Sequence, residues 1–252
     1  MLSNIATDST IIRNLYKIPQ YEQRSPEWFE QRRDKLTSSD AATALGINPY
    51  QKPFELLFKK CGVGKPFEGN VATLYGQKYE DEAIEKYCQA MGKKNHDFGL
   101  ISYDSVSREE KVKYPFLAGS TDGIAEDLDD LEGPIVLEVK CPYRRKIKHG
   151  LVPEYYMPQV QLNMAILNID KADFIEYRPD PFELNIVRVQ RDREWFDKNI
   201  IVLENFWNDV ENWRNSNIHN HPELEQYQNP KPKKNTCPIF CRRETPLLFE
   251  FK

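Results

Sequence analysis

The sequence lacks any long apolar run and any excess of positive charge. No stretch approaches the roughly 18 apolar residues that a membrane-spanning helix needs, and the first segment, MLSNIATDST, does not have the pattern of a secretory signal. The formal net charge is -4 at pH 7, so a polyanion could bind only at a local basic patch. We therefore expect no membrane partner and an intracellular location, in the cytoplasm or the nucleus.

Cysteines are also few. The five are Cys61, Cys88, Cys141, Cys237 and Cys241. This odd, scattered set argues against a disulfide scaffold and for a reducing compartment. Cys237 and Cys241 hint at a metal site, but a second Cys/His pair at the usual spacing is missing, which disfavours structural zinc or an iron–sulfur cluster.

Four segments in the first part of the chain carry helix-start and helix-stop residues: 25–33, 38–46, 52–62 and 71–91. Ser25 and Pro26 suit the cap and first position of one helix, and Ser39 or Asp40 could cap the next, which Gly46 would follow. Residues 1–24 read as a leading arm.

After residue 91 the sequence consists mainly of short segments rich in β-branched and aromatic residues, which are typical of strands. They cover residues 98–104, 115–127, 134–140, 172–178 and 184–190. A helix at 155–168, apolar on most sides, interrupts them, and an amphipathic helix at 194–215 follows. This order predicts an α/β (α+β) fold with a mixed central β-sheet flanked by helices. From about Ser216 onward, Pro, Asn and Lys dominate, which indicates a tail or extended arm with little core of its own.

Acidic residues stand at three positions where a fold alone would not favour them. Glu80 lies on the apolar stripe of the helix at 71–91, although it could also reach water or an arginine at the rim. Asp122 could form a hairpin turn with Gly123, but apolar residues resume after it, so we expect it in or beside a strand. Glu138 lies in a strand that reads as buried on both faces.

Lys140 is two residues beyond Glu138, so the two side chains share one face of that strand. They could be only an exposed ion pair. Together with Asp122 and Glu80, however, they form a set of hard oxygen ligands that suits Mg²⁺ or Mn²⁺. A lysine beside such an ion could hold or deprotonate an attacking water, and nearby cations would lower its pKa.

Five segments in order resemble the lambda-exonuclease-like, YqaJ-type viral recombinase nucleases of the PD-(D/E)XK superfamily. The segments are EWFEQRRDKLTSSDAA, GQKYEDEA, GSTDG, LEVKCP and YYMPQVQLNM, within residues 25–170. The resemblance implies a restriction-endonuclease-like fold. The resemblance covers neither the arm before Ser25 nor the basic C-terminal tail. From the predicted elements we expect the nuclease domain at residues 1–215 and the tail at residues 216–252. The resemblance is also compatible with a viral protein inside a host cell.

The resemblance also assigns roles. The metal ligands would be Glu80, Asp122, Glu138 and the Val139 carbonyl, holding two Mg²⁺ or Mn²⁺ ions, and Lys140 would be the catalytic lysine. Gln159, or else Gln161, would orient the lysine, the water or the scissile phosphate. Arg32, in preference to Arg33, and Ser39 would hold a phosphate near a DNA end, unless Arg32 only pairs with Glu30 and Asp34.

Basic patches supply the remaining expected DNA contacts. Arg144, Arg145, Lys146 and Lys148 follow the catalytic strand, and Lys231 to Arg243 holds five Lys/Arg and no acid. Each could equally be a solvated surface run, yet a net-negative nuclease needs some such patch for phosphates. Tyr143 beside the first patch could stack on a base or simply pack.

The resemblance therefore implies a two-metal phosphodiesterase, a 5′→3′ exonuclease on double-stranded DNA ends in recombination, repair or end processing. A structure-specific endonuclease and an RNA-cleaving relative are the alternatives within this fold. The non-enzyme alternative is a DNA-end-binding partner of a strand-annealing recombinase. A strand-annealing protein and further copies of the chain are open as partners.

Overall fold

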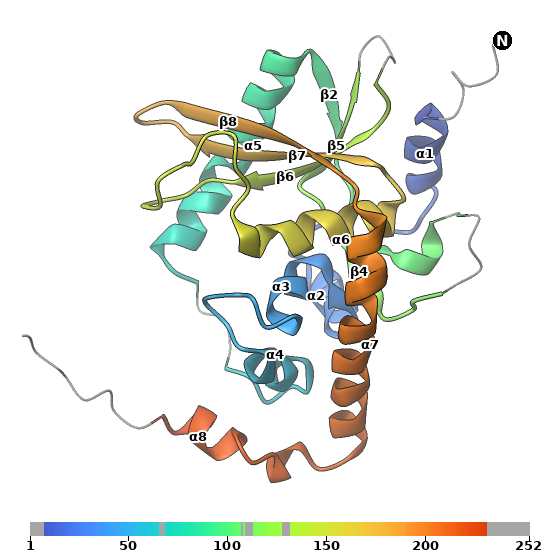
Figure 1. The fold of residues 1–252 in the computed structure, drawn as a ribbon, viewed down its shortest axis with the longest axis vertical. Helices are drawn as coiled ribbons and strands as arrows, with labels where there is room; N and C mark the ends of the chain where they lie inside the picture. The colour runs from blue at the N-terminus through green and yellow to red at the C-terminus, as the bar shows by residue number, and fades with distance from the viewer. Residues whose placement is uncertain (1–7, 66–68, 107, 109–112, 128–131, 231–252) are drawn as a thin grey trace, which may run out of the picture.

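The computed structural model describes residues 8–65, 69–106, 108, 113–127 and 132–230. Its centre is a mixed sheet of order β2–β5–β6–β7–β8 (Figure 1). Only the β6–β7 pair is parallel in this sheet; its other pairs are antiparallel. The strands are β2 Lys93–His96, β5 Gly123–Asp127, β6 Ile135–Lys140, β7 Lys171–Arg178 and β8 Glu183–Gln190.

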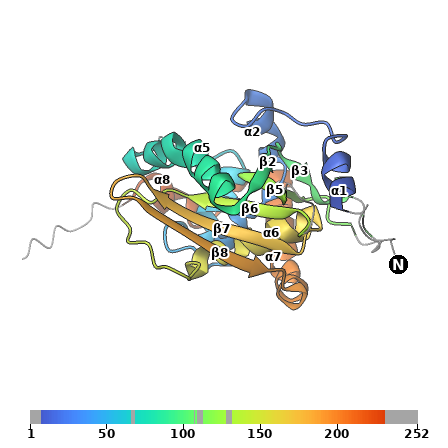
Figure 2. The same cartoon turned by 90° about the horizontal axis from the view of Figure 1, so that it is seen from above.

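Helices α5 (Val71–Met91) and α6 (Met157–Leu167) cover opposite faces of this sheet (Figure 2). Side chains alternate along β6, so Leu137 packs with the α5 side, whereas Val136 packs with the α6 side. Helix α6 is the crossover between the parallel strands β6 and β7. It is buried along nearly its whole length, as its apolar sequence predicted.

A smaller sheet of order β1–β4–β3 and a group of helices lie beyond α6 (Figure 1). Leu117 of β4 packs in one core with Leu162 of α6 and Leu203 of α7. The strands are β1 Leu36–Thr37, β3 Ile101–Ser102 and β4 Leu117–Gly119. The helices are α2 Pro26–Arg33, α3 Ala41–Ala44, α4 Pro53–Lys60, α7 Arg193–Asn215 and α8 Leu224–Gln228, with short 3-10 turns η1 Ser38–Asp40, η2 Tyr103–Ser105, η3 Glu154–Tyr156 and η4 Ile218–Asn220.

Capping residues and prolines in the sequence predicted most helix ends correctly. Ser25 caps α2 by accepting a hydrogen bond from the Trp28 backbone N–H, with Pro26 at the first position. Asp40 stands at the N-cap position of α3, as one of the two predicted residues, but its side chain does not cap that helix; the 3-10 turn η1, which follows Thr37, comes first. Asp40 reaches back to the Thr37 backbone N–H at 3.2 Å and to its hydroxyl at 2.7 Å, so its carboxylate fixes this turn.

The strand predictions need two corrections. The segment 115–127 is not one strand: β4 joins the small sheet and β5 the large one, and Thr121 and Asp122 cross between them. Strand β2 was not predicted because its sequence, KKNH, is polar. Its buried ends are held by polar contacts instead, Lys93 by an ion pair with Asp127 and His96 by a hydrogen bond with Glu126.

Both predicted appendages contribute to the core where the structure describes them. Helix α1 (Asp8–Leu15) buries Ile12 and Leu15 beside β3 and α6. Beyond Ser216, Ile218 and Leu224 are buried against α4 and α7, so the expectation of little core in this segment is wrong up to residue 230. Residues 231–252, with Cys237, Cys241 and the second basic patch, lie outside the described residues. Over the described ranges, none of the helices combines the length and apolarity that crossing a membrane requires.

Candidate active site

Glu138 and Lys140 lie on one face of β6, as predicted, at the end of the strand. The Glu138 side chain is completely buried. One of its oxygens accepts a hydrogen bond from Lys140 Nζ, and the other accepts one from Asn163 Nδ2 of α6 at 3.2 Å. An exposed ion pair is therefore excluded for Glu138.

Asp122 lies directly before β5 and not at the tip of a hairpin, which confirms the expected position beside a strand. Its Oδ2 accepts a hydrogen bond from the Val139 backbone N–H at 2.7 Å, which ties it to β6. Gly123 permits a close approach on the other side, to β2: a Cβ there would lie 2.1 Å from Asn95 Oδ1.

The Lys140 ammonium is in the middle of these oxygens. It donates to the Val139 carbonyl at 3.0 Å and lies 3.9 Å from Asp122 Oδ2, besides its contact with Glu138. Burial alone would lower the pKa of Lys140, but the Glu138 and Asp122 charges raise it above its ordinary value. Lys140 is therefore an ammonium ion that can hold an oxygen; the lowered pKa expected beside a bound cation stays a prediction.

Glu80 faces the same region from α5. Its carboxylate is 3.5 Å from the Arg24 guanidinium, and its side chain is 27% exposed. Burial, followed by repulsion from Asp122, raises the pKa of Glu80 to about 7. Burial likewise raises the pKa of Glu138 to about 7, with Lys140 opposing and Asp122 adding to the effect. The carboxylates thus repel one another across the site, and Glu80 is partly neutralised by an arginine, as one alternative proposed.

This donor set fits a divalent cation. Among the described residues, no three His, Cys, Asp or Glu side chains form a ready-made metal cluster. However, the Glu138 and Asp122 carboxylates and the Val139 carbonyl surround the Lys140 ammonium, so these oxygens already hold one positive charge. All of these donors are oxygens, the type that Mg²⁺ and Mn²⁺ prefer.

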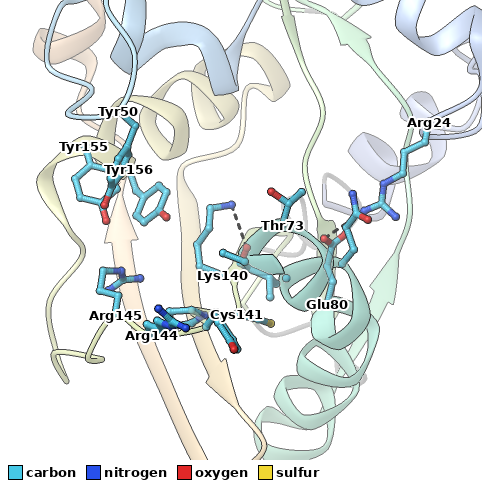
Figure 3. Close-up of a pocket in the computed structure, with 16 residues that line it drawn as sticks. Arg24, Tyr50, Thr73, Glu80, Lys140, Cys141, Arg144, Arg145, Tyr155 and Tyr156 are labelled. Carbon is cyan, nitrogen blue, oxygen red and sulfur yellow. Dashed lines mark hydrogen bonds and ion pairs between the residues drawn. The ribbon is translucent and has the colours of Figure 1, made fainter. Parts of the chain in front are cut away.

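A cleft of about 580 Å³ opens at this end of β6 (Figure 3). Glu80, Val139 and Lys140 line it together with Arg24, Arg144 and Arg145. Arg144 is exposed and lies over the Tyr143 ring, whereas Arg145 pairs with the fully buried Glu176. Arg145 therefore has a structural partner, which a charge run in the sequence could not reveal.

Arg32 and Ser39 are brought together as predicted. Arg32 donates to the Ser39 hydroxyl at 2.8 Å and to the Thr37 hydroxyl at 3.1 Å, and it stacks over Trp28. The partners foreseen for Arg32, Glu30 and Asp34, are taken instead by Arg33, at 2.6 Å and 3.8 Å. These contacts favour Arg32 over Arg33 as the candidate residue for holding a phosphate.

Asp40 is next to Ser39, and its negative charge alone would repel a phosphate there. In the structure two cations offset this charge. Lys60 Nζ is 2.8 Å from Asp40 Oδ2, and both side chains are buried. Burial would raise the pKa of Asp40, but the Lys60 and Arg32 charges outweigh it and hold the pKa well below its usual range. The Asp40 carboxylate is thus matched by two cations.

The two glutamines of α6 have different surroundings. Gln161 is buried; it donates to the Gln190 carbonyl at 2.9 Å and accepts from the Asp192 backbone N–H at 2.8 Å. It therefore fixes the junction between β8 and α7. Gln159 is half-buried and makes neither of these contacts, so it is the better candidate for a role at the site.

Sequence reasoning missed four features of the site. Asn163 was overlooked, although a polar residue within an apolar helix is a usable signal. Arg24, which has a left-handed backbone (φ 71°), lines the cleft from the segment before α2. A group of tyrosines also lines it: Tyr50, Tyr155 and Tyr156. Cys141 lies in the cleft as well, but burial raises the pKa of its thiol to about 12, so it remains protonated.

The chain matches the family described as YqaJ-like viral recombinase domain over residues 27–170, more than half of its length. It is 31% identical over 179 residues to the uncharacterized protein R354 of Acanthamoeba polyphaga mimivirus, which covers 66% of this chain and 31% of that protein. It is 30% identical over 172 residues to protein D345L of African swine fever virus, which covers 62% of this chain and 49% of that protein. The chain thus spans between 31% and 49% of the length of these relatives.

Among solved structures, the chain is similar to an alkaline exonuclease, LHK-Exo, from Laribacter hongkongensis. The TM-score is 0.59 at 22% identity, covering 81% of this chain and 97% of that one. For LHK-Exo in complex with dAMP the TM-score is 0.61 at 23% identity, covering 76% and 95%. This likeness confirms the predicted fold, a restriction-endonuclease-like mixed sheet flanked by helices.

Proposed function

Because the chain belongs to the YqaJ-like viral recombinase domain family, we propose that it is a divalent-metal-dependent exonuclease. Its substrate is double-stranded DNA, which it degrades from the ends in the 5′→3′ direction during recombination or repair. The observation that carries the proposal is the cluster of Asp122, Glu138 and Lys140, in which the Glu138 carboxylate is fully buried, at the edge of a cationic cleft. A protein that only binds DNA ends gains nothing from burying a carboxylate whose pKa is raised to about 7.

The chemistry divides among the residues of the cleft. Glu80, Asp122, Glu138 and the Val139 carbonyl would hold two Mg²⁺ or Mn²⁺ ions, which activate water and neutralise charge on the scissile phosphate when bound. Lys140, as an ammonium, holds the attacking water or a phosphate oxygen in place.

Contacts away from the cluster position the DNA. Arg144 attracts the phosphate backbone at the mouth of the cleft, and Gln159 orients the water or the phosphate. Arg32 and Ser39 receive the terminal phosphate, since a guanidinium grips phosphate oxygens in pairs. The fold shared with an alkaline exonuclease supports an exonuclease activity in general.

The test uses the purified protein with Mg²⁺ on two substrates. One is linear DNA, labelled in turn at each end, and the other is covalently closed circular DNA. We expect linear DNA to lose nucleotides from its 5′ ends, closed circles to survive, and a chelator to stop the reaction. Equal cutting of circles would replace the proposal with the endonuclease alternative, and undiminished activity in excess EDTA would reject the metal site. RNA substrates in the same assay test the RNA-cleaving alternative.

Variants connect the activity to the site. Glu138→Gln and Asp122→Asn each remove a ligand charge with little change of shape, and turnover should fall at least about 100-fold. Asp197→Asn on the exposed side of α7 is the matched control and should cut at the wild-type rate. Wild-type turnover in either site variant would show that other carboxylates hold the metal.

A further inference from the structure

The tyrosines of the cleft have no part in the proposed metal and phosphate chemistry. Tyr50 and Tyr155 meet edge to face, with ring centroids 5.7 Å apart, and the Tyr155 and Tyr156 centroids are 4.4 Å apart. Figure 3 shows the three rings gathered across the cleft from Glu80 and Arg24, with Lys140 between. They form one aromatic wall beside the reacting centre.

Core packing explains only part of this wall. Tyr156 packs against Phe174 of the sheet, with centroids 5.5 Å apart. Tyr50, in contrast, is 76% exposed, which is the largest exposure among the large apolar and aromatic side chains of the described residues. Its loop is nevertheless held, because the Tyr50 backbone N–H donates to Asn48 Oδ1 at 2.9 Å and Asn48 donates to the Thr43 hydroxyl at 2.8 Å. The fold thus presents an exposed ring from a fixed loop.

The charged residues around the cleft indicate which kind of ligand could bind against this aromatic wall. The charged residues that line the cleft are Arg24, Lys140, Arg144, Arg145 and one acid, Glu80. Lys140 Nζ is 5.4 Å from the centroid of the Tyr156 ring, so the wall adjoins the cation at the reacting centre. Exposed rings next to cations are the combination that binds the bases and phosphates of an unpaired nucleic-acid strand.

We propose that Tyr50 and Tyr155 form a stacking subsite for an unpaired nucleobase of the strand being cleaved. A base within a duplex is already stacked on its neighbours, so it can meet this wall only after it has left the stack. The substrate that occupies the cleft is therefore a frayed or single-stranded end. This inference rests on the proposed function, because it names the form of DNA that the same cleft receives.

Binding without metal tests the subsite separately from cleavage. The probe is a labelled single-stranded oligonucleotide in EDTA, compared with oligonucleotides in which one nucleotide is replaced by an abasic residue, moved position by position from the 5′ end. At one position near the end, the wild-type protein should bind the intact strand about 5- to 150-fold more tightly than the abasic one. Tyr50→Ala should remove this preference, and Tyr50→Phe should retain it.

Phe182→Ala, an exposed aromatic on the turn between β7 and β8, is the matched control and should leave the preference intact. Equal binding of intact and abasic strands by the wild-type protein would overturn the subsite. So would a loss in Phe182→Ala as large as that in Tyr50→Ala. If the preference is found but Mg²⁺ supports no cleavage, the subsite stands and the nuclease proposal fails; if cleavage occurs without any preference, the reverse holds.

Discussion

Replacing Glu138 with glutamine should stabilise the fold while it lowers turnover at least about 100-fold. The carboxylate is fully buried, and its pKa is raised from 4.5 to about 7, chiefly by burial. A carboxyl whose pKa is higher in the folded than in the unfolded chain opposes folding once it ionises. Glutamine has nearly the same shape and can never ionise, so the variant lacks this cost.

The magnitude follows from linkage. The raised pKa means that stability falls as the pH rises from about 4.5 through 7 and then levels off. The cost of Glu138 is about 1 kcal/mol at pH 5 and about 3 kcal/mol at pH 8. For a chain of 252 residues, about 3 kcal/mol corresponds to a rise of roughly 6–12 °C in melting temperature.

The assay is thermal and urea unfolding of wild-type protein and Glu138→Gln in a metal-free buffer, at pH 5 and at pH 8. We expect a small advantage of the variant at pH 5 and a larger one at pH 8. Mg²⁺ should then raise the melting temperature of the wild-type protein more than that of the variant, because the ion stabilises the ionised carboxylate. A variant less stable than wild type at pH 8, or a difference independent of pH, would refute the reasoning.

Three further variants test neighbouring contacts. Lys140→Ala should lower turnover about 10²–10⁴-fold; a structural ion pair would instead cost about 0–1 kcal/mol in a melting curve and leave the rate unchanged. Arg32→Ala should erase a preference for 5′-phosphorylated over 5′-hydroxyl ends at fixed salt, whereas Arg33→Ala should keep it, and equal rates on both ends in wild type would contradict the end-binding role. Asn163→Ala should lower stability at pH 8 by about 1.5–3 kcal/mol in urea unfolding, since Glu138 loses a hydrogen bond; unchanged stability would show that this bond contributes nothing.

Periodicity and caps were sufficient for the elements that carry the site. The strand at 134–140 was recognised from its apolar run, and its alternation placed Glu138 and Lys140 on one face. The helix at 71–91 was predicted from its apolar stripe. In the structure it begins after the N-cap Asn70 and ends before Gly92, which has a left-handed backbone. Apolar periodicity and capping residues depend only on neighbouring positions in the sequence, so these two elements could be predicted without knowledge of the fold.

Pairing between distant residues could not be read in this way. Arg145 looked like a free basic group, but Glu176, on the neighbouring strand β7, is buried and requires a cation. Strand β2 has no apolar pattern because an ion pair of Lys93 and a hydrogen bond of His96 satisfy its buried ends. The tyrosine wall joins a loop near residue 50 with a turn near residue 155, and only the tertiary fold brings these together.

Arg24 shows how the surrounding structure can hold a disfavoured backbone conformation at the site. An arginine at φ 71° costs free energy that glycine would avoid, so neighbouring contacts must maintain it. Gln23 supplies them: its amide donates to the Phe98 and Thr121 carbonyls at 3.3 Å each, one residue before Asp122. The guanidinium is thereby placed 3.5 Å from Glu80, where it lowers the pKa of that carboxyl against the effects of burial and Asp122. The strained backbone thus keeps a positive charge beside the one candidate ligand that the β6 lysine does not contact directly.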